Sequence, residues 1–182
     1  ILNIEDVNAT IQSDLAIAYK NSGRDPIDLY RKRFQGKPTN PSYGLQLVEA
    51  LTEDSNYEEA ITTLKRVIKL NTMSKRPYRI LADLSMETDD LDGAASAYES
   101  LHNIDPNDES VTINISNVYL EKEDFRQALK WAEKSISLDR KSGDVFAQKA
   151  KVYYEGWTSF RDGDSKDDKI VATLAYNYYI KA

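Results

Sequence analysis

Residues 109–142 read ESVTINISNVYLEKEDFRQALKWAEKSISLDRKS, and this stretch repeats the apolar pattern of the 34 residues before it. Ala128 lies within it, and Ala94 and Ala60 precede Ala128 at successive intervals of 34 residues. A period of this length is typical of a helix, a turn and a second helix that must stack on neighbouring copies to bury its apolar face. The sequence therefore predicts an array of helix hairpins.

Other columns keep the same period. With repeats beginning at Pro41, Lys75 and Glu109, the seventh position holds Leu47, Leu81 and Ile115, and the tenth holds Ala50, Leu84 and Val118. Within each half, apolar residues recur three and four positions apart, which is the spacing of an amphipathic helix. A small residue in the alanine column allows the second helix to cross its neighbours closely.

The second helices carry start signals of their own. Asn56 with Glu59, and Asp124 with Gln127, approximate a capping box, and Asp90 occupies the same column. Each of these side chains is expected to accept backbone N–H groups at the start of a helix.

The predicted domain organisation has two parts. Residues 1–40 are expected to form a degenerate N-terminal hairpin or capping unit, and residues 41–182 a regular array with repeats at 41–74, 75–108, 109–142 and 143–182. The closing pattern of the last repeat is delayed, which indicates an insertion over residues 156–168. The chain begins with Ile1, so the native N-terminus is expected to be absent.

In these columns the chain resembles the tetratricopeptide repeat family. The resemblance covers about residues 41–182 well and residues 1–40 poorly, and the family's turn glycine is replaced by Ser55, Asp89 and Glu123. It implies an all-α solenoid of stacked antiparallel hairpins that coil into a right-handed superhelix. It also implies a non-enzymatic scaffold for protein–protein interaction.

The resemblance further implies that the first helix of each repeat lines a concave groove. The candidate groove residues are Glu53, Arg76, Arg79, Asp83, Met86, Glu87, Ile113, Asn114, Asn117, Leu120, Glu121, Lys151, Tyr154 and Glu155. Four of them are glutamates one period apart, which predicts a carboxylate stripe that attracts a basic or mixed-charge segment of another protein. The alternative is that these glutamates favour helix formation on a solvated face.

Two other kinds of function stay open. The chain could be a structural spacer or assembly subunit that associates with itself or docks through its ends. It could also be the docking domain of a larger enzyme.

Arg76 and Arg79 could clamp a carboxylate, since arginine presents paired donors. The chaperone-tail clamp known in the family is not expected, because Asp83 stands where asparagine is needed and later basic positions are missing. An ordinary solvated or salt-bridged arginine pair is the simpler interpretation.

The insertion carries two aromatic residues, Trp157 and Phe160. As part of a loop they would either contact a partner or cover the apolar edge of the array. Asp162 and Asp164 have the spacing of a calcium loop, but the glycine and the final glutamate of that motif are missing, so no metal site is expected.

A single basic run, Arg31 to Arg33, lies between Tyr30 and Phe34. Nucleic-acid binding is one interpretation. The two aromatic residues are four positions apart, however, and are expected to be buried together while the cations point to water.

The composition argues against several other functions. The net charge of −6 is the wrong sign for a protein that grips phosphate backbones, so no nucleic-acid partner is expected. There is no cysteine, and the neighbours of His102, the single histidine, supply no obvious nucleophile. We predict no catalytic residue, cofactor or metal. No apolar run is long enough for a membrane helix, so a soluble fragment without membrane contact is expected, with a cytoplasmic or an exported location left open.

Overall fold

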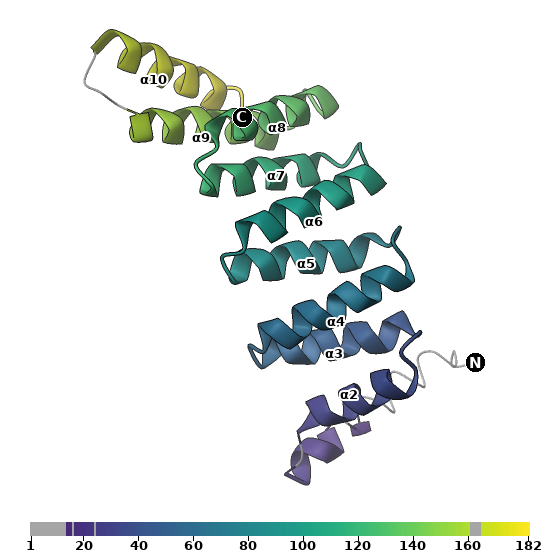
Figure 1. Ribbon diagram of the computed structural model, residues 1–182. Coiled ribbons are helices and arrows are strands. Elements are labelled where there is room, and N and C mark those ends of the chain that lie inside the picture. The colour runs from purple at the N-terminus through teal and green to yellow at the C-terminus, as the bar shows by residue number, and fades with distance from the viewer. Residues whose placement is uncertain (1–13, 16, 24, 161–164) are drawn as a thin grey trace. The chain divides into compact units, whose positions relative to one another are not determined.

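A computed structural model describes residues 14–15, 17–23, 25–160 and 165–182 (Figure 1). These residues form helices, turns and short connections and contain no strand. In chain order the helices are α2 (Pro26–Gly36), α3 (Pro41–Glu53), α4 (Tyr57–Leu70), α5 (Lys75–Glu87), α6 (Leu91–Ile104), α7 (Glu109–Glu121), α8 (Phe125–Leu138), α9 (Gly143–Phe160) and α10 (Ser165–Tyr179). The prediction of an all-α fold built from helix hairpins is confirmed.

The chain divides into two compact units, Ile1–Pro77 and Tyr78–Ala182, which we call the N-terminal and C-terminal units. In the N-terminal unit α3 packs on α2 and α4, and in the C-terminal unit each helix from α6 to α10 packs on the next one. The sequence-based division into residues 1–40 and four following repeats is a different one and stays a prediction. The helix pairs α3–α4 and α7–α8 nevertheless lie within residues 41–74 and 109–142.

The alanine column marks close helix packing, as expected. Ala60, Ala94 and Ala128 are each 0% exposed. A larger side chain at any of these positions would have to displace neighbouring atoms in a densely packed interior.

The hairpin turns keep left-handed backbone geometry without glycine. Ser55, Asp89 and Glu123 have φ angles of 59°, 58° and 57°. In the first turn, Asn56 N donates to Leu51 O at 2.8 Å and Ser55 N to Thr52 O at 3.0 Å. This pair of bonds is a Schellman motif, and it recurs at Asp89 and Glu123. The turn is therefore specified by its backbone hydrogen bonds.

Two of the three predicted caps form. Asp90 accepts from Gly93 N at 2.9 Å, and Asp124 accepts from Gln127 N at 3.0 Å. The prediction for Asn56 was wrong, because its side chain makes no capping hydrogen bond. Asn56 has a φ of −86° and a ψ of 63°, close to the values of the two aspartates, so the backbone does not explain the difference.

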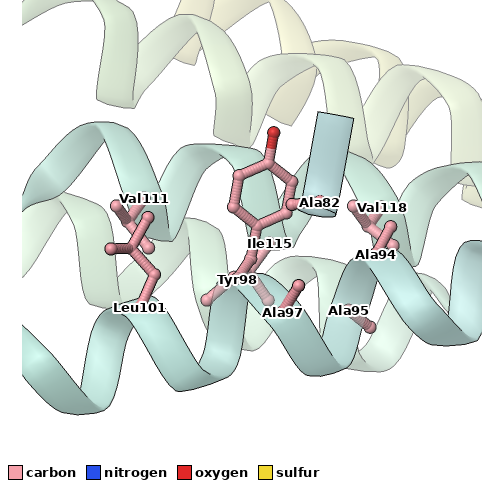
Figure 2. Close-up of a cluster of buried hydrophobic side chains, with 9 residues drawn as sticks. All are labelled: Ala82, Ala94, Ala95, Ala97, Tyr98, Leu101, Val111, Ile115 and Val118. Atoms are coloured by element: carbon pink, nitrogen blue, oxygen red, sulfur yellow. The ribbon is translucent and has the colours of Figure 1, made fainter. Parts of the chain in front are cut away.

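A large apolar cluster of the C-terminal unit joins α5, α6 and α7 (Figure 2). Its buried members are Ala82, Ala94, Ala95, Ala97, Tyr98, Leu101, Val111, Ile115 and Val118. Ala94, Ile115 and Val118 come from repeat columns that the sequence marks as apolar, and the cluster joins one hairpin to the first helix of the next.

In the N-terminal unit α2 packs through Phe34, which is 1% exposed. Gly44 leaves no room for a side chain beside Val67 and Phe34, so α3 and α4 approach closely there. The expectation that the basic run points to water was wrong for Arg31. Its guanidinium donates to both carboxylate oxygens of Glu59, at 2.9 and 2.8 Å, and so links α2 to α4.

The predicted insertion loop is partly helical. α9 continues to Phe160, and α10 begins at Ser165, so Trp157 lies on a helix and not in a loop. A Cβ at Gly156 would lie 3.3 Å from the Phe125 ring, so the extended part of α9 passes close to the start of α8. This packing outweighs the low helix propensity of glycine. The side chain of Phe160, and the calcium-like Asp162 and Asp164, lie outside the described residues.

Candidate functional site

The candidate groove residues fall in both compact units: Glu53 and Arg76 belong to the N-terminal unit and the others to the C-terminal unit. In the N-terminal unit, Glu53 is exposed and lines a hollow of about 410 Å³ together with Lys20 and Tyr30. Arg76 forms an ion pair with Glu49 on α3, and both side chains are exposed. Arg76 therefore already has a carboxylate partner within its own unit.

A second hollow, of about 470 Å³, lies in the C-terminal unit. We call it the α7–α9 groove, and its lining residues are Ser110, Ile113, Asn114, Asp144, Ala147, Gln148, Lys151 and Tyr179. Three of the predicted groove residues, Ile113, Asn114 and Lys151, meet here. Tyr179 comes from α10, and sequence reasoning missed it because the last helix is out of step with the repeat.

Residues one period apart are neighbours across this groove. Lys151 Nζ on α9 donates to Asn117 Oδ1 on α7 at 3.3 Å, and the two residues are separated by 34 positions. One helical turn further along both helices, the same register brings Glu121 next to Glu155. Lys151 Nζ is 4.0 Å from Glu155 Oε1, and Glu121 is exposed. The two carboxylates are therefore expected to share one end of the groove.

Glu87, on α5, occupies the same column as Glu121 and is also exposed. Arg79 and Asp83 on the same helix are engaged within the protein. Arg79 pairs with Asp108 at 3.3 Å, and Asp83 Oδ1 accepts from the Tyr98 hydroxyl at 2.8 Å. Burial raises the pKa of Tyr98, and the hydrogen bond to Asp83 raises it further. Arg79 is therefore salt-bridged, and Asp83 is hydrogen-bonded to a buried tyrosine. This agrees with the simpler interpretation of Arg76 and Arg79 as an ordinary solvated or salt-bridged pair.

Two of the predicted apolar contact residues contribute little surface. Leu120 is 3% exposed and packs with Ala128, Ala132 and Val152, so the expectation that it faces a partner was wrong. Met86 is half-buried against the cluster of Figure 2. Both belong to a column at the edge of the groove, where a small rotation of the helix turns the side chain into the core.

Exposed aromatic surface lies on the fourth and fifth turns of α9. Tyr154 is 49% exposed, and its ring centroid is 6.0 Å from that of Trp157. The pair adjoins Glu155 in sequence and continues the helix face that carries Lys151. An exposed ring next to carboxylates offers a partner both contact area and charge.

A buried polar chain supports the floor of the groove. Gln148 is 6% exposed and donates from Nε2 to Ser116 Oγ at 3.0 Å, and Ser116 donates to the carbonyl of Ala128 at 2.8 Å. These bonds connect α9 to α7 and α7 to α8. They fix the spacing of the helices that form the groove.

His102 is a packed residue of the core. It is 6% exposed, its ring meets the Trp131 ring edge to face at 5.2 Å, and Lys134 Nζ lies 2.6 Å from Nε2. Burial lowers the pKa of His102, and the charge of Lys134 lowers it further.

Over the described residues no group of His, Cys, Asp and Glu is arranged to hold a metal ion. None of the described helices has both the length and the apolarity to span a membrane.

Comparisons with known proteins agree with this arrangement. The sequence model of the tetratricopeptide repeat family matches residues 112–142. No curated protein sequence matches the chain significantly. The family match marks residues 112–142 as a tetratricopeptide repeat, in agreement with the resemblance that the columns of the sequence indicate.

Solved structures of MamA share the fold. One crystal structure is 19% identical over 100% of this chain and 93% of that chain, with a TM-score of 0.68. Another is 21% identical over 94% and 88%, with a TM-score of 0.69. MamA 41-end from Desulfovibrio magneticus RS-1 is 14% identical over 95% and 93%, with a TM-score of 0.66. At these identities the likeness shows the α-solenoid fold.

Proposed function

We propose that the chain is a non-enzymatic interaction module whose α7–α9 groove binds an extended, basic or mixed-charge segment of another protein. The observation that carries the proposal is the groove itself, an open hollow of about 470 Å³ between the first helices of two repeats. Repeat arrays commonly bind partners on surfaces of this kind. Peptides that lie in such grooves need both apolar contacts and fixed polar groups.

The charge of the partner follows from the carboxylates around the groove. Asp144 lines the hollow, and Glu121 and Glu155 lie one helical turn beyond Asn117 and Lys151. Lys151 is the single basic side chain among the lining residues. A cationic segment would therefore meet a complementary field, and its association should weaken as salt screens the charges.

The test is a selection from a peptide display library, followed by affinity measurements. The selected peptides should carry net positive charge and some apolar residues. Reversing Glu121 and Glu155 to lysine should weaken their binding by at least about tenfold, or about 1.4 kcal/mol. Asp54→Lys together with Glu58→Lys, both at exposed positions of the other unit, is the control with the same change of net charge. Selection of acidic peptides, or equal affinity in the double variant and the control, would contradict the proposal.

Self-association through the C-terminal end is a second candidate. α10 exposes Ile170, Tyr176 and, just past its end, Ile180, at 59%, 65% and 65%. Apolar side chains gathered on one helix are a common feature of association surfaces. Sedimentation velocity over a range of concentrations tests this candidate. The mass should rise with concentration, and Tyr176→Ser with Ile180→Ser should abolish the rise; a constant mass in the original protein would exclude it.

A further inference from the structure

The hairpin of α9 and α10 contains a cation at a position where the other repeats have an apolar residue. Lys149 occupies the seventh position of its repeat, the column of Leu47, Leu81 and Ile115. Its side chain is only 9% exposed. A lysine buried to this degree requires partners that compensate for the lost water.

Three side chains supply this compensation. Lys149 Nζ lies 2.8 Å from Glu133 Oε1 on α8, 4.8 Å from the centre of the Tyr178 ring on α10, and 5.8 Å from that of Tyr153 on α9. The two tyrosine rings are stacked, with centroids 5.7 Å apart and planes inclined by 17°. Lys149 therefore contacts three successive helices.

α10 packs along α9, but few of its described apolar side chains are fully buried there. Among its described side chains, Ala175 is the single buried apolar one, at 4% exposure. Gly143 at the start of α9 leaves no room for a side chain beside the backbone of Ala182, so the chain after α10 lies against that glycine. Apolar contacts are not directional, so Ala175 and the half-buried Val171 and Ala172 do not by themselves select one register of α10 along α9.

Tyr179 connects this docking to the groove. It directly follows Tyr178, the ring that covers Lys149, and it lines the α7–α9 groove beside residues of α7 and α9. If α10 moved by one turn, Tyr179 would leave this wall. The position of α10 therefore decides the shape of the groove at this end.

We propose that Lys149 is a positioning residue, which fixes the register of α10 on α9 and thereby holds Tyr179 in the wall of the groove. Buried polar pairs are known to specify one register at some expense of stability. Burial acts to lower the pKa of Lys149, but the hydrogen bonds to Glu133 and Tyr178 raise it above its usual range, so the ammonium stays charged. The link to the groove rests on the proposed function, whereas the register of α10 does not.

The register can be measured without any ligand. The sequence contains no cysteine, so Lys130→Cys on α8 and Asn177→Cys on α10 allow two spin labels to be placed alone, and both positions are exposed. In the parent protein the distance between the labels should have one narrow distribution. In Lys149→Met a second population should appear, displaced by on the order of 5 Å, which is one helical turn.

The thermal midpoint separates positioning from simple stabilisation. Methionine suits an apolar column, so Lys149→Met should keep or raise the midpoint while the distance distribution changes. Lys169→Met, an exposed lysine of α10, is the matched control and should change neither quantity. Tyr178→Leu removes the other half of the contact and should give the same second population, which keeps the test valid if Lys149→Met does not fold.

A single unchanged distance in Lys149→Met would overturn the proposal, whether or not the groove binds peptides. For the link to the groove, peptides from the selection described above should bind Lys149→Met at least about threefold more weakly, although the buried Lys149 cannot touch them. A changed register with unchanged affinity would overturn that link and leave the proposed function intact. Failure of the selection itself would overturn the proposed function and leave the register result standing.

Discussion

The hairpins α7–α8 and α9–α10 lie in the same unit and are built on the same repeat, but they are held together differently. α7–α8 is closed by apolar side chains, among them Leu120, Ala128 and Ala132, each at most 3% exposed. α9–α10 is closed by the Lys149 contact and by Ala175. The comparison shows that hairpins with the same repeat period can be closed by different side chains, and under our proposal the residue that departs from the period, Lys149, sets the register of its hairpin.

The largest effect should come from substituting the same column in the two hairpins. Ile115 in α7 and Lys149 in α9 both stand at the seventh position. Ile115→Ala should lower the free energy of unfolding by about 2–5 kcal/mol, because it leaves a cavity in a core that is 0% exposed there. Urea unfolding of this variant and of Lys149→Met checks the contrast. A larger loss in Lys149→Met would mean that the two hairpins do not differ as described.

A smaller effect is expected at the helix caps. Asp124→Ala removes the side-chain acceptor that meets Gln127 N at 3.0 Å, and should cost about 1 kcal/mol. Asn56→Ala is the matched variant in α4, where no capping bond forms, and should cost distinctly less. Thermal unfolding of the two variants measures the difference, and equal losses would contradict the assignment of the caps.

The turn of the regular hairpin offers a stabilising substitution. Glu123 has a φ of 57°, a conformation that disfavours residues with a Cβ. Glu123→Gly should therefore raise the free energy of unfolding by up to about 1 kcal/mol. Glu121→Gly, two residues earlier and inside α7, should lower it by a similar amount. If both glycines destabilise, the left-handed turn is not under strain.

The smallest effect should be a dependence of the folding stability on pH that arises from the titration of His102. Its folded-state pKa is lowered by burial and by Lys134, while Glu99 and Asp105 act in the opposite direction. The unfolded chain therefore binds the proton first, and stability should fall as pH decreases below about 6.5, the ordinary pKa of histidine. His102→Gln should show a weaker decline in urea midpoints between pH 7 and pH 5. An identical decline would exclude His102 as its source.

The fold could be predicted from the sequence because the same apolar pattern, and hence the same helix packing, recurs in several repeats. Ala60, Ala94 and Ala128 have one environment, so three weak signals in register support one conclusion. The turns at Ser55, Asp89 and Glu123 also keep their geometry without glycine, since their backbone hydrogen bonds determine it.

The site could be predicted only in part. Ile113, Asn114 and Lys151 line one hollow, because their columns face the same way on the first helices of successive repeats, while their role in binding a partner stays a prediction. Leu120 is buried and does not line the groove, because its position in the repeat does not reveal a small rotation of the helix at the edge of the core. Tyr179 was missed because α10 is out of step with the repeat, and the helical part of the insertion was missed because the repeat columns do not predict the close approach of Gly156 to Phe125.

The most direct test of the central claim is to map a selected basic peptide onto the isotope-labelled protein by NMR. The account predicts that the amide signals of Ile113, Asn114 and Gln148, in the α7–α9 groove, shift on titration while those near His102 and Trp131 do not. Shifts confined to the surroundings of His102, with the groove signals unchanged, would contradict it.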